Sequence, residues 1–287
     1  MSAAALWRLG KTYESSGGTV AYEMLGDGPP VVLVHGTPSW SYLWRNVADV
    51  LAGRFTVYLF DLLGYGTSEQ RDGQDVSIGA QTRMLAELLD TWQLQEPCIA
   101  GHDFGAAITL RLMLLQGRHF RRVALCDAVA IAPWITPFSR HVQRHLQAFQ
   151  TVPEHIHRQM IATHLRTAIA RDMTDADLEP YLRPWLGPSG QAAYYRQVAQ
   201  FDERYTREVE ARYGEISTPT LVLWGEQDGW LDPAFGQQLA GTIPGARLAL
   251  IPGAGHFLPE DQPRRVAEAL ASFFATTELT PADPAAP

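Results

Sequence analysis

Short apolar runs alternate with stretches of helical periodicity along this chain, and no other feature of the sequence limits the fold as strongly. The apolar runs span residues 31–34, 56–60, 97–100, 123–126, 220–224 and 247–251. The helical patterns span residues 42–51, 78–92, 104–115, 233–240 and 263–274. Apolar runs without a polar face, joined by helices, are typical of parallel strands that are buried on both sides. The sequence therefore predicts an α/β fold with a mostly parallel sheet covered by helices on both faces.

The alternation is interrupted once, between residues 130 and 213. This segment shows helical patterns broken by prolines but no strand pattern, and the strand signal returns after Pro219. A helical insertion at the carboxyl ends of parallel strands lies over the place where such sheets bind ligands. We predict a main domain of residues 1–129 and 214–276, an all-helical cap of residues 130–213 and a disordered tail of residues 277–287. Residues 11–24 alternate loosely, which predicts one or two antiparallel edge strands.

Composition and charge exclude several classes of function. The chain has 287 residues, 46% of them hydrophobic, and a net charge of −8, so we expect a soluble protein without a basic face for nucleic acid. Residues 1–7 are too few and too uncharged for a signal peptide, and no apolar run is long enough to span a bilayer. We therefore expect a cytoplasmic protein without membrane insertion. Cys98 and Cys126 fall in predicted buried strands, where free thiols are expected.

Residues 101–105 read Gly-His-Asp-Phe-Gly and stand between an apolar run and a helical pattern. A nucleophile between small residues, on a tight turn from strand to helix, is presented to a ligand beside backbone N–H groups. The central residue here is Asp103, at a position that often holds serine. Aspartate side chains are ionised near neutral pH and displace leaving groups from saturated carbon. The pattern predicts that Asp103 is a nucleophile, although the five residues alone fit a helix cap equally well.

Three other segments follow apolar runs and add candidate catalytic groups. Thr37, in the His-Gly-Thr-Pro segment of residues 35–38, offers a backbone N–H to developing negative charge, and the Thr37-Pro38 bond is a candidate cis peptide. His256 lies in a glycine-rich loop after the last run and is a candidate base. Asp228 follows the preceding run and is the favoured acid to orient His256, while Asp127 is the alternative acid. We expect neither a metal nor a cofactor.

Taken together, these motifs resemble the α/β-hydrolase superfamily over residues 13–274, and more narrowly its aspartate-nucleophile branch of epoxide hydrolases and haloalkane dehalogenases. Residues 35–38 are similar to that branch's oxyanion motif, residues 61–68 to its Gly-x-small-x-Ser turn, and residues 101–105 to its nucleophile motif. The resemblance implies that Asp103 forms an alkyl ester. It also implies that the N–H groups of Thr37 and Phe104 form the oxyanion hole while water cleaves the ester.

The resemblance leaves two substrate classes open. Residues 41–45 resemble the first helix of dehalogenases. Dehalogenases, however, bind the departing halide with N–H donors such as a tryptophan next to the nucleophile or an asparagine after the His-Gly pair. Phe104 and Thr37 occupy those two positions here, so Trp134 or Trp185 from the cap would have to bind the halide.

Epoxide hydrolases use cap tyrosines to protonate the opening oxygen. Tyr195 matches the later of these tyrosines, and His141 or His145 are candidates to replace the earlier one. We therefore predict hydrolysis of a small apolar epoxide by water to a vicinal diol. Release of halide from a halogenated substrate is the second prediction, and a non-catalytic receptor for a small ligand is the third.

Overall fold

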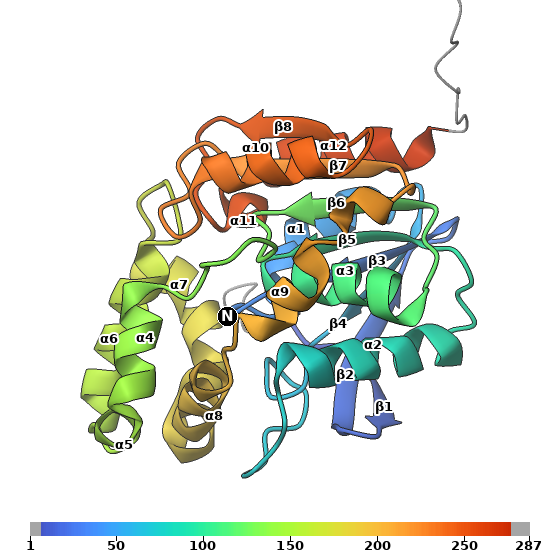
Figure 1. The fold of residues 1–287 in the computed structure, drawn as a ribbon. Helices are drawn as coiled ribbons and strands as arrows, with labels where there is room; N and C mark the ends of the chain where they lie inside the picture. The colour runs from blue at the N-terminus through green and yellow to red at the C-terminus, as the bar shows by residue number, and fades with distance from the viewer. Residues whose placement is uncertain (1–6, 277–287) are drawn as a thin grey trace, which may run out of the picture.

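The computed structural model describes residues 7–276 and contains one eight-stranded sheet in the order β1-β2-β4-β3-β5-β6-β7-β8 (Figure 1). The strands from β3 to β8 run parallel, while β1 and β2 form an antiparallel extension beside β4. This arrangement confirms the predicted fold class. The predicted tail of residues 277–287 lies outside the described residues. The strands are β1 (Lys11–Ser15), β2 (Gly18–Leu25), β3 (Pro30–Val34), β4 (Thr56–Phe60), β5 (Cys98–His102), β6 (Arg122–Cys126), β7 (Thr220–Gly225) and β8 (Arg247–Ile251).

Helices flank the sheet on both faces and also follow β6 as a separate group. The helices that flank the sheet are α1 (Arg45–Leu51), α2 (Ile78–Thr91), α3 (Phe104–Gln116), α10 (Pro233–Thr242), α11 (Leu258–Asp261) and α12 (Pro263–Ala275). Those between β6 and β7 are α4 (Pro137–Arg144), α5 (Leu146–Gln150), α6 (Glu154–Arg166), α7 (Asp175–Leu182), α8 (Gly187–Ala199) and α9 (Arg204–Glu210). Short 3₁₀ helices span Ser41–Trp44, Arg183–Trp185 and Tyr213–Glu215.

Alternate residues of each central strand enter different cores, because successive side chains in a strand point to opposite faces. In β3, Val32 and Val34 pack in the core that holds the apolar side chains of α2 and α3. Val31 and Leu33 pack in a second core with α1 and α12. Burial on both faces is the reason that the strand segments carry no polar stripe in the sequence.

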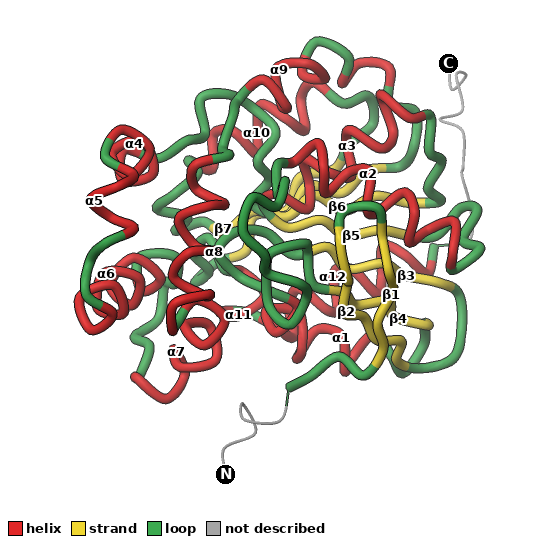
Figure 2. The backbone as a smooth tube through the Cα atoms, turned by 90° about the horizontal axis from the view of Figure 1, so that it is seen from below, coloured by secondary structure: helices red, strands yellow, loops and turns green. Residues whose placement is uncertain are grey.

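The predicted cap segment, residues 130–213, contains helices and no strand. Its helices α4 to α8 lie beyond the carboxyl ends of the parallel strands, toward which the arrowheads of β6 and β8 point in Figure 1. Figure 2 shows the same helices grouped at one end of the sheet. Local signals start these helices. Thr136 caps α4 ahead of Pro137, and Thr174 forms a capping box with Asp177 at α7. The boundaries of the cap as a separate domain stay a prediction.

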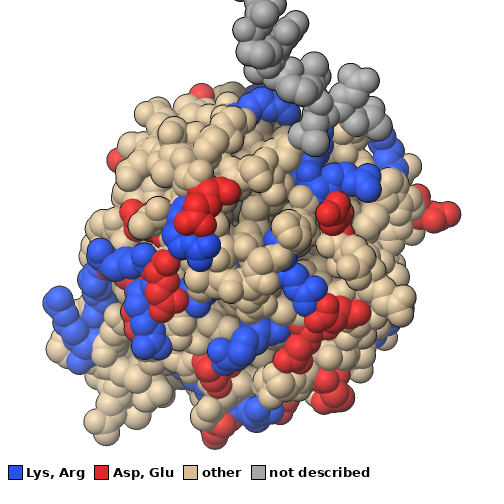
Figure 3. All heavy atoms as spheres, turned by 45° about the vertical axis from the view of Figure 1, so that its right-hand side comes forward, with Lys and Arg blue, Asp and Glu red and all other residues tan. Residues whose placement is uncertain are grey.

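Two expectations from composition concern the charged surface and the cysteine thiols. Acidic and basic side chains are interspersed over the face shown in Figure 3, without a continuous basic patch there. Within residues 7–276, no helix is long and apolar enough to cross a membrane. Cys98 and Cys126 are buried and free, on the neighbouring strands β5 and β6.

Candidate active site

Asp103 stands on a strained bend between β5 and α3. Its backbone has φ 52° and ψ −114°, which non-glycine residues rarely adopt. Glycine is required on both sides of the bend. A Cβ on Gly101 would lie 2.4 Å from the Gly105 carbonyl oxygen, and one on Gly105 would lie 2.3 Å from the Val34 carbonyl oxygen. The Asp103 side chain makes no capping hydrogen bond to α3, which rules out the helix-cap alternative.

The predicted oxyanion segment reaches the carboxylate. The Thr37 N–H donates to Oδ1 of Asp103 at 2.7 Å, and the Thr37-Pro38 peptide is cis, as expected from the sequence. Phe104 is the first residue of α3, and the first N–H groups of a helix have no partner within that helix. The Thr37 N–H therefore holds one oxygen of Asp103. The Phe104 N–H lies at the same bend and is not used by a hydrogen bond within α3. The oxyanion role of both residues stays a prediction.

His256 bridges two carboxylates. Its Nδ1 donates to Oδ2 of Asp228 at 2.9 Å, and its Nε2 lies 3.5 Å from Oδ2 of Asp103. Asp228 is fixed in turn, since its Oδ1 accepts the N–H groups of Trp230 at 2.8 Å and Leu231 at 2.9 Å. The Nε2 atom of His256 is buried and has no hydrogen-bond partner among residues 7–276. The structure thus brings together the three residues that the sequence predicts as nucleophile, base and acid.

The charges beside His256 change its basicity. Burial disfavours the imidazolium, but the carboxylates of Asp228 and Asp103 outweigh burial and raise the pKa of His256 well above its usual value. Formation of an ester on Asp103 would remove one of these two negative charges. The pKa of His256 would then fall, so the imidazole would become available as a base after alkylation.

Asp127, the alternative acid, points elsewhere. Its Oδ1 accepts the Gly225 N–H at 2.8 Å, and its Oδ2 is buried without a partner among the described residues. Burial, together with the negative charge of Asp228, raises the pKa of the Asp127 carboxyl well above its usual value. Asp127 thus lies beside the triad, bonded to the Gly225 N–H, and makes no hydrogen bond to His256.

Asparagine at position 228 should slow ester hydrolysis by about 100-fold or more, because the amide no longer stabilises the imidazolium that forms at His256. Asp127→Asn should change this step far less, since Asp127 makes no hydrogen bond to His256 and the asparagine carbonyl can still accept the Gly225 N–H. Rapid-quench measurement of ester decay in both variants checks the ranking. The reverse ranking would transfer the acid role to Asp127.

The catalytic candidates open into one apolar cavity between the sheet and the cap segment. Asp103, His256 and Thr37 line it on the sheet side. The apolar lining includes Phe104, Trp134, Ile135, Val198, Phe201 and Leu231. Such a cavity favours a small apolar substrate and strengthens the electrostatic interactions within it.

The cap segment lines the cavity with one face of α8, which continues into the residues after this helix. Tyr194, Gln197, Val198 and Phe201 line it at spacings of three, four and seven residues, as one helical face does. Tyr195 does not line it, because neighbouring helix residues point about 100° apart. The structure therefore places Tyr194, and not the predicted Tyr195, at the cavity.

The Tyr195 hydroxyl is already engaged within the cap segment. Nε2 of His157 lies 2.9 Å from the Trp185 carbonyl oxygen, which can only accept a hydrogen bond, so Nε2 carries the proton. Nδ1 then accepts the Tyr195 hydroxyl at 3.0 Å. In contrast, the Tyr194 hydroxyl has no hydrogen-bond partner within residues 7–276. Burial raises the pKa of both tyrosines, that of Tyr195 to about 12, so both phenols are neutral near pH 7.

The remaining cap candidates are not free donors to the cavity. His141 and His145 are exposed and lie with their ring centres 4.6 Å apart, away from the cavity lining. Trp185 does not line the cavity, and its Nε1 donates to the Pro38 carbonyl at 2.8 Å. Trp134 does line the cavity with its ring, but its Nε1 donates to Thr206 Oγ1 at 3.0 Å.

Gln197 and His164 also line the cavity and were not predicted from the sequence. Gln197 shares a helical face with Tyr194, so the three-residue spacing was the available signal. His164 stacks on Trp230 at 4.4 Å between ring centres, and Trp230 lies against His256. Burial, with a smaller effect of nearby His256, lowers the pKa of His164 to about 4, so its imidazole is neutral. Nothing in the sequence around His164 distinguishes it from the other cap histidines.

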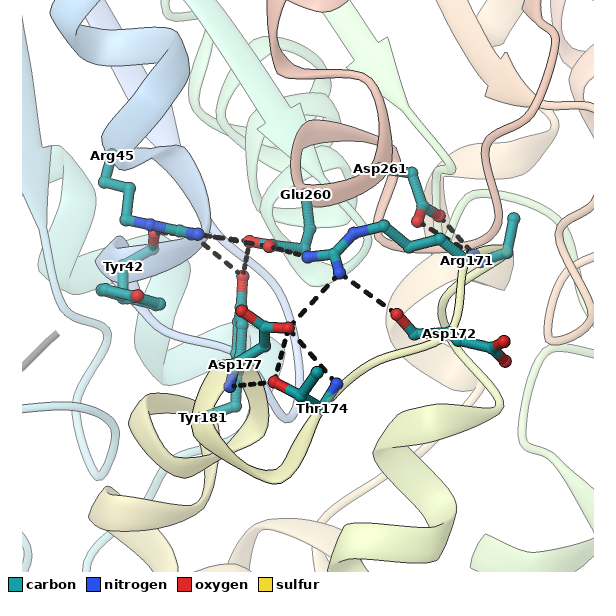
Figure 4. Close-up of polar contacts among 10 residues, drawn as sticks. Tyr42, Arg45, Arg171, Asp172, Thr174, Asp177, Tyr181, Glu260 and Asp261 are labelled. Carbon is teal, nitrogen blue, oxygen red and sulfur yellow. Dashed lines mark hydrogen bonds and ion pairs between the residues drawn. The ribbon is translucent and has the colours of Figure 1, made fainter. Parts of the chain in front are cut away.

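A buried carboxylate ties the cap segment to the helix that follows His256 (Figure 4). Glu260 of α11 accepts hydrogen bonds from Arg45 of α1 at 2.6 Å and from Arg171 of the cap segment at 2.7 Å. It also accepts the Tyr181 hydroxyl of α7 at 2.6 Å. Two guanidinium groups and one phenol thus satisfy a carboxylate whose side chain is only 3% exposed. The contacts join three elements that are distant in the sequence.

The neighbouring carboxylate fixes the loop that carries the base. Asp261 accepts the Gly255 N–H at 2.8 Å, one residue before His256, and the Ala170 N–H of the cap segment at 2.9 Å. Figure 4 shows Asp261 beside Arg171, which also bonds to Glu260. The position of His256 is therefore coupled to the seating of the cap segment on the sheet.

Comparisons with known proteins agree with the α/β-hydrolase fold and with a similarity to its aspartate-nucleophile branch. A family model described as alpha/beta hydrolase fold matches residues 29–263. The chain is 28% identical to haloalkane dehalogenase 2 of Mycobacterium tuberculosis over 277 residues, which cover 91% of this chain and 93% of that protein. It is 41% identical to an alpha/beta hydrolase fold protein from Burkholderia ambifaria, with a TM-score of 0.89 and coverage of 92% and 97%. A thermophilic esterase from Thermogutta terrifontis shares the fold at 22% identity, with a TM-score of 0.74 and coverage of 91% and 96%.

Proposed function

We propose that this chain, which belongs to the α/β-hydrolase fold family, hydrolyses a small apolar epoxide through an alkyl ester on Asp103. The observation that carries the proposal is the position of the Asp103 carboxylate between an N–H donor and the candidate base. Thr37 N–H holds one oxygen of Asp103, and His256 Nε2 lies 3.5 Å from the other. In this proposal the helical segment of residues 130–213 acts as the cap that closes the apolar cavity.

The first step is displacement at saturated carbon. An oxygen of Asp103 attacks a ring carbon, the carbon–oxygen bond of the epoxide breaks, and its electron pair passes to the epoxide oxygen. Tyr194 gives that oxygen a proton, in place of Tyr195, whose hydroxyl is bound to His157. The product of this step is an ester between Asp103 and a hydroxyalkyl group.

The second step is attack of water on the ester. His256 takes a proton from water, and the water oxygen adds to the carboxyl carbon of Asp103. The N–H groups of Thr37 and Phe104 bind the oxyanion that forms. The intermediate then collapses with cleavage of the bond between the carboxyl carbon and the alkoxy oxygen. The alkoxy oxygen takes the proton held by His256, and the diol leaves. The second proton of the water passes from the new carboxyl group through solvent to the Tyr194 phenolate, so the phenol, the neutral imidazole and the Asp103 carboxylate, with one oxygen from water, are all restored.

Dehalogenation is the second candidate, favoured by the similarity to haloalkane dehalogenase 2 over nearly the whole chain. The nucleophile, the base and the acid would be the same, and a halide ion would leave with the electron pair of the carbon–halogen bond. The tryptophan donors expected for a halide are, however, occupied in this chain, since Trp134 and Trp185 donate to Thr206 and Pro38. The unoccupied Tyr194 hydroxyl supports the epoxide as the first candidate.

A panel of short-chain epoxides and haloalkanes tests the proposed function. We expect diol from an epoxide, detected by chromatography, with slower or no release of halide. Halide release without diol formation would favour the dehalogenase. Tight binding of a small ligand without any turnover would favour a receptor on this fold.

Tyr194→Phe should slow epoxide opening by about 100-fold, because only the phenolic proton is removed and general acid catalysis is worth this much or more. Tyr195→Phe is the matched control on the same helix and should have a small effect on the opening step. Single-turnover formation of the Asp103 ester compares the two variants. A larger effect of Tyr195→Phe would return the acid role to that residue.

A further inference from the structure

We propose that the side-chain amide of Gln197 binds the leaving atom of the substrate while Asp103 attacks the carbon that carries it. The leaving atom is an electronegative atom on saturated carbon, either the epoxide oxygen or a halogen. This inference rests on the proposed nucleophilic role of Asp103. It makes Gln197 a catalytic residue of α8 that replaces the missing tryptophan and asparagine donors.

Gln197 is buried beside the nucleophile with one end of its amide unused. The residue is 2% exposed and lines the same cavity as Asp103 and His256. Its Oε1 accepts two hydroxyl groups, those of Thr37 and of Tyr65, the latter at 2.6 Å. Its Nε2 is buried and has no hydrogen-bond partner among residues 7–276. A buried amide donor without a partner is rare in proteins and calls for a ligand or another specific explanation.

The two hydroxyl groups fix which end of the amide is free. Each of them is a donor within hydrogen-bond distance of Oε1, and the Thr37 and Tyr65 hydroxyls also contact each other. A reversed amide would present N–H groups to both hydroxyls, and since only one hydroxyl could then donate to the other, at least one buried hydroxyl hydrogen would have no acceptor. The observed orientation therefore keeps the N–H groups of Gln197 away from Thr37 and Tyr65.

The free donor is suited to an atom that gains negative charge. Oδ1 of Asp103 already accepts the Thr37 N–H at 2.7 Å, and no hydrogen bond joins Gln197 to Asp103. The N–H groups of Gln197 are thus available to a group that the substrate brings. An N–H donor in an apolar cavity stabilises a departing alkoxide or halide more strongly than it stabilises the neutral substrate. The contact would consequently accelerate the first step.

The test compares the two chemical steps in the Gln197→Met variant. Methionine keeps the length and removes the donor. We expect formation of the Asp103 ester to slow by about 100-fold, the effect of removing one preorganised donor. Hydrolysis of that ester should stay within about threefold of wild type, because the leaving atom has already departed. Rapid-quench mass spectrometry of the protein resolves both rates.

Gln191→Met is the matched control. Gln191 lies on the same helix and is also buried, but its Nε2 donates to the Val152 carbonyl at 2.8 Å and the residue does not line the cavity. This variant should leave both steps near wild-type rates. A fold disturbed by loss of a buried glutamine would instead slow both steps in either variant.

An epoxide and a matched pair of chloro- and bromoalkanes identify the leaving atom. If Gln197→Met loses ester formation with the epoxide, the Gln197 amide binds the epoxide oxygen. A larger loss with chloride than with bromide assigns it to halide, since chloride is the poorer leaving group and depends more on a donor. Unchanged ester formation, or equal slowing of both steps, would overturn the role of Gln197. Absence of any Asp103 adduct in the wild-type protein, with all three substrates, would instead overturn the proposed function itself.

Discussion

Replacement of Asp103 by alanine should reduce turnover by about a millionfold, the effect of removing a catalytic nucleophile. No other carboxylate can take its place, because Asp228 is bound to His256 and Asp127 faces Gly225. Asp103→Ser should not restore epoxide hydrolysis, since a hydroxyl is a weak nucleophile toward saturated carbon. Product formation over several days at high protein concentration measures the residual rate. Near-normal turnover by either variant would exclude Asp103 as the nucleophile.

A single turnover of the wild-type protein in heavy-oxygen water gives an independent check of the same assignment. Water attacks the carboxyl carbon of Asp103 in the proposed mechanism, so the label should enter the Asp103 side chain. Mass spectrometry of the peptide that contains residues 101–105 measures the incorporation. Label found only in the product would mean direct attack of water on the substrate. Circular dichroism of the Asp103→Ala and Asp103→Ser variants controls for folding. Both variants should fold, because the Asp103 side chain makes no capping hydrogen bond to α3.

The sheet was predictable because its burial pattern is local in sequence. The strands β3 and β5 are apolar at every position of the predicted runs, and the structure buries them between two layers of helices. The strand and helix limits shift by only a few residues. The 3₁₀ turn Ser41–Trp44 before α1 is the main difference, since the sequence predicts one helix over residues 42–51.

The catalytic candidates of the main domain were predictable for a similar reason. Parallel strands end at one edge of the sheet, so Asp103, Asp228 and His256 come together although they are far apart in the sequence. The choice between Asp228 and Asp127 needed geometry. Both follow a strand, and the structure joins only Asp228 to His256 by a hydrogen bond.

The cap-side groups could not be predicted, because the face that a cap helix turns to the cavity depends on contacts between distant segments. Tyr194 and Tyr195 are adjacent and chemically identical, and the sequence match favours Tyr195. The structure turns Tyr194 and Gln197 to the cavity, where Gln197 meets Thr37 and Tyr65. These contacts are separated by more than a hundred residues, and no local pattern encodes them.

Replacement of His256 by alanine should produce a protein that alkylates itself and then stalls. A carboxylate needs no base before it attacks, so the first step does not depend on the imidazole. The second step does, because water must lose a proton as it adds to the ester. We expect ester hydrolysis to slow by about ten thousandfold, the effect of losing one member of a catalytic triad. Intact-protein mass spectrometry after incubation with a substrate should show one adduct, located on Asp103.

The pH dependence of the wild-type protein adds a second measure of the same role. Two carboxylates raise the pKa of His256 in the free enzyme, and ester formation removes the charge of Asp103. The base in the ester intermediate must be neutral, so hydrolysis should rise with pH through a pKa lower than that of His256 in the free enzyme. Ester formation, which uses the carboxylate directly, should not follow this rise. A His256→Ala variant that forms no adduct with a true substrate would mean that the histidine acts before the covalent step, as it does for a serine nucleophile, and would contradict the proposed mechanism.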